Sequence, residues 1–108
     1  MLIVEWSHIT ETEEIPPMGD ELRNHLRNRK GQVKYASCSA WNLLHQTMLS
    51  NGLPVSTISI TDAGKPYLLD SSIHISLSHS HGVCAVAVAD RPVGVVSWDA
   101  KSEKTLSR

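Results

Sequence analysis

Apolar residues along the chain change their spacing several times, and each change indicates a new element. Residues 2–9 are rich in β-branched and aromatic side chains, which favours a strand. Pro16 and Pro17 then interrupt regular structure, because each proline ring fixes the backbone and removes an N–H donor. We therefore expect a strand and a loop ahead of the first helix.

Two helices are predicted where apolar residues recur at helical spacing. Asp20 is a good N-cap for the first helix, which places Leu22 and Leu26 on one face. The second helix is predicted over about residues 32–50, and "SNG" at 50–52 is a typical C-terminal stop. Its recurring positions are Val33, Ala36, Ala40, Leu43, Leu44, Thr47 and Met48.

The remaining segments have the alternation of strands. Residues 56–61 alternate, with Ile58 and Ile60 on one face. Ile75 and Leu77 alternate with polar residues, which is typical of a half-buried strand. Both segments should therefore pack one face against a core.

Residues 83–89 are apolar at every position, which predicts the central strand of the sheet. The turn "DRP" leads to a further strand at 93–97. The pattern as a whole predicts an α+β fold in which one long helix packs on a mostly antiparallel sheet. A chain of 108 residues is expected to form a single domain, residues 1–108.

Composition excludes several classes of function. A net charge of -1 and a pI near 6.6 argue against a bulk electrostatic nucleic-acid binder. The first ten residues, "MLIVEWSHIT", are too short and too polar for a signal or membrane segment. Cys38 and Cys84 lack CxxC spacing and lie in apolar surroundings, so we expect buried, reduced thiols in a cytoplasmic protein.

The charges are unevenly distributed. The first 21 residues hold six acidic residues and no Lys or Arg, whereas residues 23–34 hold five of the ten basic residues. Such a cluster is usually a solvated helix face. Its alternative role is a docking surface for a small, highly charged anion.

Two further features favour an anion site. Lys65 stands between Gly64 and Pro66, so its ammonium should project from a defined turn. The stretch "SHS" at 78–80 offers hydroxyl donors and an imidazole at a strand end, beside Gly82. Each feature is weak alone, because such turns and polar hairpins are common.

His79 and His81 also suggest a metal site, because residues two apart on a strand share a face. Neither a cysteine nor an acidic residue nearby completes four ligands. A catalytic Cys–His pair has little support, because apolar surroundings favour an inert thiol.

The stretches "GKPYL" and "IHISLSHSHGVCAVAVADRPVGV" resemble the N-terminal lobe of the larger, two-lobed 4'-phosphopantetheinyl transferases, the surfactin-synthetase-activating class. That family typically has Gly-Lys-Pro, then Ser-His-Ser at a strand end, an apolar strand and a "vGvDiE" strand. The resemblance covers roughly residues 30–95 in order and spacing, and includes the helix "KYASCSAWNLLHQTML".

The resemblance implies an enzyme that moves phosphopantetheine from coenzyme A to a serine of an acyl or peptidyl carrier protein, leaving 3',5'-ADP. Ser78 and His79 would contact the phosphates of coenzyme A, and Lys65 would lie near its 3'-phosphate. The other cations that the resemblance places there are Lys34 and either Arg29 or Lys30. Desolvated phosphates need such partners, because leaving their charge unpaired is costly.

The chain departs from the family where Mg²⁺ should bind. Val96 and Trp98 occupy the positions of the family's Asp-x-Glu pair, and neither can ligate Mg²⁺. A shifted register offers Asp99 as a candidate ligand but puts Lys101 in place of the glutamate, and Glu103 needs a further shift. We therefore expect Mg²⁺ binding to be impaired and assign no catalytic residue.

The second lobe of the family is also missing. "WDAKSEK" at 98–104 has the family's Trp-x-x-Lys spacing, but Ser102 stands where a glutamate should follow. The chain looks like one lobe, either a fragment or a shortened gene product. The resemblance therefore predicts a coenzyme A-binding lobe, impaired in catalysis on its own. The alternatives are a non-catalytic interaction module, expected to be a homodimer, and a small His-based metal-binding protein.

Overall fold

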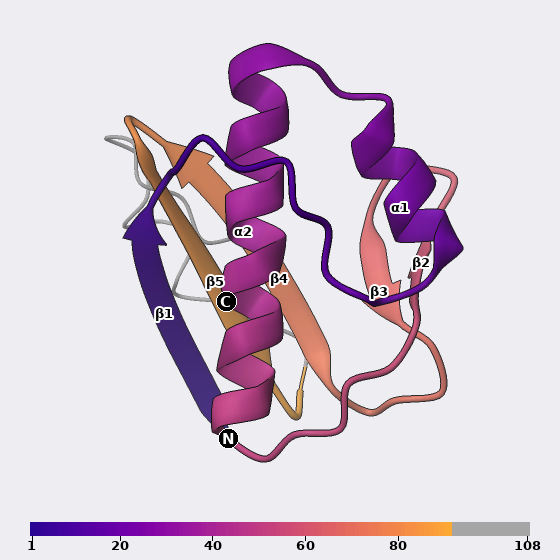
Figure 1. Ribbon diagram of the computed structural model, residues 1–108. Coiled ribbons are helices and arrows are strands. Elements are labelled where there is room, and N and C mark those ends of the chain that lie inside the picture. Colours follow the sequence, from indigo (N-terminus) through magenta and orange to yellow (C-terminus); the bar gives the residue numbers. More distant parts are fainter. Residues whose placement is uncertain (92–108) are drawn as a thin grey trace.

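The α+β class is confirmed in the computed structural model, which describes residues 1–91 (Figure 1). The predicted strand at 93–97 lies outside these residues. The elements follow in the order β1 (Leu2–His8), α1 (Asp20–Arg27), α2 (Gly31–Ser50), β2 (Ile58–Ile60), β3 (Pro66–Leu68), β4 (His74–Ser80) and β5 (Val83–Ala89).

All strand pairs among residues 1–91 are antiparallel, but they form two sheets. The larger has the order β1-β5-β4, so the prediction that Val83–Ala89 is the central strand is confirmed. The smaller pairs β2 with β3. Strand β3 was missed because it is only three residues long and begins at a proline.

Helix α2 lies across one face of the larger sheet, where the core is formed (Figure 1). Leu44 and Met48 of α2 and Val86 and Val88 of β5 are fully buried there. Removing this apolar surface from water is the main force that holds helix and sheet together. Val33, the first of the recurring positions of this helix, lies outside the core, because its side chain is 49% exposed.

The C-terminal stop predicted for α2 is confirmed by its hydrogen bonds. Gly52 has a φ of 67°, its N–H donates to the Leu49 carbonyl at 3.2 Å, and Leu53 N–H donates to the Met48 carbonyl at 2.9 Å. These two bonds satisfy carbonyls that a helix end leaves free. Glycine adopts this left-handed conformation without strain.

The predicted architecture of one long helix on a sheet is incomplete, because α1 is a second helix that packs beside it. It buries Leu22 and Leu26, as predicted, beside α2 and the β2–β3 hairpin (Figure 1). The Glu21 carboxylate accepts hydrogen bonds from Ser59 Oγ and from the backbone N–H of Ile60, which ties α1 to β2.

The N-cap of α1 is Gly19 rather than Asp20, so that prediction is wrong by one residue. Gly19 has a φ of 105°, and a Cβ atom there would lie 2.5 Å from Thr57 Cγ2. Backbone conformation and close approach both demand glycine at this position. Asp20 instead lies in the first helical turn, where its charge favours the helix dipole.

Both cysteines are free and buried, as predicted. Burial raises the pKa of the Cys38 and Cys84 thiols above their ordinary value. Such thiols are poor nucleophiles, because the thiolate is the reactive form. No helix within residues 1–91 has the length and hydrophobicity needed to cross a lipid bilayer.

Candidate functional site

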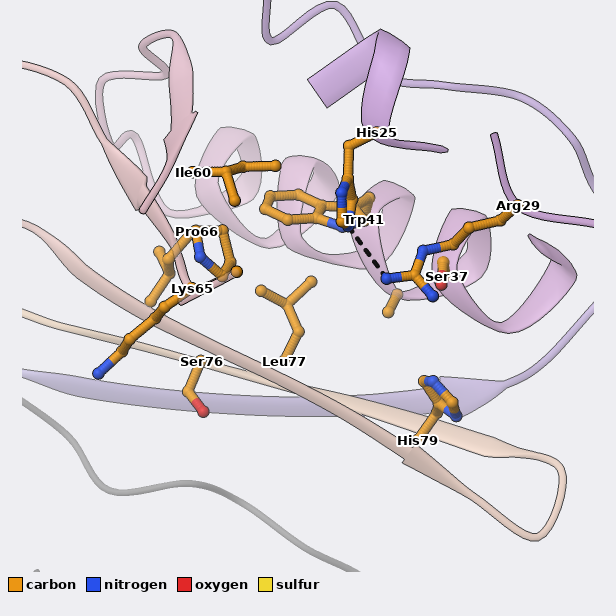
Figure 2. Close-up of a pocket in the computed structure, with 13 residues that line it drawn as sticks. His25, Arg29, Ser37, Trp41, Ile60, Lys65, Pro66, Ser76, Leu77 and His79 are labelled. Carbon is orange, nitrogen blue, oxygen red and sulfur yellow. Dashed lines mark hydrogen bonds between the residues drawn. The ribbon is translucent and has the colours of Figure 1, made fainter. Parts of the chain in front are cut away.

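A cavity of about 350 Å³ lies between α1, α2, the β2–β3 hairpin and β4 (Figure 2). It brings together Arg29, Lys65 and His79, three of the five residues predicted to bind phosphate. Apolar side chains form much of its wall, and a second histidine, His25, contributes from α1. The apolar lining comprises Ala40, Trp41, Ile60, Pro66, Ile75 and Leu77.

The position of the cavity follows from the side chains of α2. Residues 36–40, "ASCSA", are all small, and Ser37 and Ala40 line the cavity. One turn further along, Leu44 fills the corresponding space in the core. Because protein interiors pack densely, a run of small residues beside a sheet leaves room unless a neighbour fills it.

Arg29 is held in the loop between α1 and α2. Its backbone N–H donates to the Leu26 carbonyl at 3.1 Å, and its guanidinium Nη2 lies 3.1 Å from His25 Nε2 (Figure 2). Arginine is always protonated and can only donate, so His25 Nε2 must be the acceptor and the ring proton must sit on Nδ1. The cation is therefore oriented by a neutral imidazole.

Burial, and secondarily the charge of Arg29, lowers the pKa of His25 below its ordinary value. Both effects disfavour the doubly protonated ring. Arg29 follows His25 by four residues, but α1 ends at Arg27, so helical spacing does not predict this contact, which depends on the loop between α1 and α2.

Lys65 lies at the other end of the cavity, as the residue before β3. Its backbone N–H donates to Thr61 Oγ1 at 3.0 Å, and its carbonyl accepts from Thr61 N–H at 2.9 Å. The predicted turn is thus confirmed. Figure 2 shows the ammonium directed away from the His25–Arg29 pair. Lys65 also lines an adjoining cavity of about 250 Å³ with Tyr67 and His74.

His79 lies on the same face of β4 as Ile75 and Leu77, towards α2. It also lines a third cavity, of about 340 Å³, with Gln32 and Gly82. Lys65 and His79 are thus each shared between two cavities, and the three cavities form a series along the rim of β4.

Ser78 does not join this site. Successive side chains on a strand point to opposite faces, so Ser78 faces away from α2, beside Ala85 of β5. Its Oγ is buried and has no hydrogen-bond partner among the described residues. Ser78 and His79 therefore point to opposite faces of β4, and the contact of both with the phosphates of coenzyme A stays a prediction.

Lys34 is also separate from the cavity. Its Nζ lies 3.1 Å from Glu13 Oε1, and its side chain is only 18% exposed. Glu13 belongs to the acidic N-terminal segment, and it neutralises this lysine. The sequence shows that the segment is acidic but not where it lies in the fold. Lys34 is therefore not available to the cavity in this arrangement.

The premise of the metal-site alternative, that His79 and His81 share a strand face, is wrong. His81 does not share a strand face with His79, because it lies in the β4–β5 turn with a φ of 51°. Its Nδ1 lies 2.9 Å from Ser80 Oγ. Within residues 1–91, no group of three or more His, Cys, Asp or Glu side chains could hold a metal ion.

The positions predicted to have lost the metal ligands, Val96 and Trp98, lie outside the described residues. The same holds for the candidate ligand Asp99 and for Lys101 and Glu103.

Comparisons with models of protein families, with curated proteins and with solved structures find no match to this chain.

Proposed function

We propose that the cavity binds the phosphate groups and adenosine of coenzyme A, as the transferase-like motifs suggest. The observation that carries this proposal is the meeting of Arg29, Lys65 and His79 around one cavity with an apolar wall. These residues come from three separate parts of the chain. The chain would act as a coenzyme A-binding lobe related to the 4'-phosphopantetheinyl transferases.

Charge supports an anionic ligand. Within residues 1–91, neither Arg29 nor Lys65 forms an ion pair with a carboxylate, whereas Arg23 pairs with Asp20 and Lys34 with Glu13. Cations without a counter-charge favour an anion, and phosphates accept the charge-assisted hydrogen bonds that guanidinium and ammonium donate. Arg29 and Lys65 therefore keep their charges available beside the cavity, whereas the charges of Arg23 and Lys34 are already paired.

The apolar wall supports an aromatic or aliphatic group on the same ligand. Trp41 closes the cavity from α2, opposite Leu77 of β4 (Figure 2). Ligand sites typically combine such walls with a few convergent polar groups, in volumes of about 300–1,000 Å³. The series of three cavities along β4 suits an elongated ligand with charge at more than one point.

Calorimetry with coenzyme A, 3',5'-ADP and pantetheine tests the proposal. We expect coenzyme A and 3',5'-ADP to bind with and without Mg²⁺, and pantetheine, which carries no phosphate, to bind much more weakly. Arg29→Ala should reduce affinity, whereas Arg23→Ala, which removes a paired arginine, should not. Lack of measurable coenzyme A binding would overturn the proposed function.

Autonomous transfer to a carrier protein is proposed to be absent or nearly so. The reason is the sequence alone: Val96 and Trp98 stand where the family has its metal-binding carboxylates. Without a bound cation, the charge that develops on the leaving 3',5'-ADP lacks its main stabilisation. Mg²⁺-dependent loading of an acyl or peptidyl carrier protein, followed by mass spectrometry, would refute this part.

A second proposed role is that of an interaction module that forms a homodimer. It is favoured because the sheet face opposite α2 exposes apolar side chains. Leu2, Val4 and Trp6 of β1 are 64%, 45% and 56% exposed. Among residues 1–91, β1 pairs only with β5, so its other edge can pair with a second copy. A two-fold centred on Val4 would set Leu2 of one copy against Trp6 of the other.

Sedimentation of the intact chain and of Trp6→Glu tests this second role. The intact chain should form a dimer that Trp6→Glu disrupts. A monomer at all concentrations would exclude it.

A further inference from the structure

The contact between His25 and Arg29 depends on the protonation state of His25. Neutral His25 accepts from the guanidinium through Nε2, at 3.1 Å. A second ring proton would turn Nε2 into a donor and place two cations in contact. Burial and the charge of Arg29 lower the pKa of His25, so the neutral ring is favoured in the absence of an anion.

An anion in the cavity would reverse this preference. A phosphate oxygen beside the pair can accept from both the guanidinium and a protonated Nε2, and its charge offsets the repulsion between the two cations. Both side chains line the cavity and approach one another at its wall (Figure 2). Bound anion and bound proton would then stabilise one another, which is reciprocal coupling between two ligands.

We propose that His25 positions the Arg29 guanidinium at the cavity and takes up a proton when a phosphate or sulfate group binds there, so that anion affinity rises as the pH falls. This rests on the proposed function above and adds to it a residue that the family resemblance does not assign. His25 is thus a positioning residue that also senses the charge of the ligand.

Other charged groups around His25 have to be separated from this effect. Glu21 lies one turn earlier on α1, but its carboxylate is engaged by Ser59 and Ile60 of β2. The β2–β3 hairpin contributes Lys65 and β4 contributes His79, while α2 lines the cavity with Ser37, Ala40 and Trp41, which have no acidic or basic side chain. His79 is therefore the other imidazole that can respond to an anion.

Nuclear magnetic resonance of the imidazole protons provides the direct test, with sulfate as the probe. Sulfate keeps its charge where imidazole titrates, whereas the phosphates of 3',5'-ADP gain protons there. We expect the pKa of His25 to be higher in saturating sulfate than in chloride of equal ionic strength. Each unit by which sulfate raises this pKa means that sulfate binds about tenfold more tightly when His25 is protonated than when it is neutral.

Two variants assign the effect. His25→Gln retains an acceptor for Arg29 but has no titrating group, so sulfate affinity should lose the pH dependence that comes from His25. His79→Gln should retain that part of the pH dependence. His45→Gln, in the C-terminal half of α2 and away from the three cavities, should behave as the unmodified protein.

Two results would contradict the proposal while leaving the proposed function intact. One is that sulfate binds but the pKa of His25 is the same in sulfate and chloride. The other is that His25→Gln keeps the full pH dependence. If neither sulfate nor 3',5'-ADP binds at any pH, the proposed function and this inference both fail.

Discussion

The two halves of α2 pack against neighbouring parts of the structure with different results. In the N-terminal half, the small residues Ala36, Ser37 and Ala40 line cavities along β4. In the C-terminal half, Leu44 and Met48 are fully buried in the core. The same helix therefore stabilises the fold at one end and leaves a candidate binding site at the other, and side-chain volume makes the difference.

The largest effect is expected in the C-terminal half. Leu44→Ala should lower the free energy of unfolding by about 2–5 kcal/mol, because it removes buried surface and leaves a cavity in a packed region. Urea denaturation followed by circular dichroism measures the loss. A change no larger than that of an exposed-site variant such as Leu49→Ala would show that this half is not the core.

Arg29→Ala should have the next largest effect, and on binding rather than stability. We expect 3',5'-ADP affinity to fall by about 1.5–3 kcal/mol, the usual contribution of a hydrogen bond to a charged group. Calorimetry on Arg29→Ala and on the control Arg23→Ala measures it. Equal losses in the two variants would show that only overall charge matters.

Filling the N-terminal half should block the site. Ser37→Leu adds a large side chain to the cavity wall and should weaken 3',5'-ADP binding at least tenfold, or about 1.4 kcal/mol. Fluorescence of Trp41, which lines the same cavity, should lose its response to the ligand. Gln46→Leu, at an exposed position of the other half, is the control, and unaltered binding by Ser37→Leu would remove the cavity from the site.

The smallest expected effect on binding distinguishes Lys65 from Lys34, although both were predicted to contact phosphate. Lys65→Ala should weaken 3',5'-ADP binding by about 0.5–1 kcal/mol, because the lysine is exposed and solvent screens its charge. Lys34→Ala should weaken binding less, because its charge is already paired with Glu13. The opposite order, measured by the same calorimetry, would favour a ligand that approaches from the N-terminal segment.

Local pattern was sufficient for most of the elements. The alternation at Ile75 and Leu77, the helical spacing at Leu22 and Leu26, and the uninterrupted apolar run of Val83–Ala89 each predicted an element that the structure contains. These patterns predict elements because side chains return to the same face at a fixed interval, which differs between a helix and a strand. The spacing of buried residues therefore indicates which element they belong to. The short strand β3 gave no comparable pattern.

The candidate site was predicted less completely. Arg29, Lys65 and His79 do meet, but His25 was missed, Ser78 lies on the opposite face of β4, and Lys34 is paired. Sequence motifs identify residue types and spacing along the chain. They do not specify which side of a strand faces a helix or which charge finds a partner.

The sequence by itself determined the α+β class, the central position of β5 and the presence of both a basic cluster and a Ser-His-Ser strand end. Only the tertiary structure decided that β2 and β3 form a separate sheet, that the small residues of α2 leave a cavity, and that His25 holds Arg29 beside it. Periodicity is a local property of the backbone, whereas cavities and charge partners depend on side chains that are distant in sequence and meet only in the folded chain.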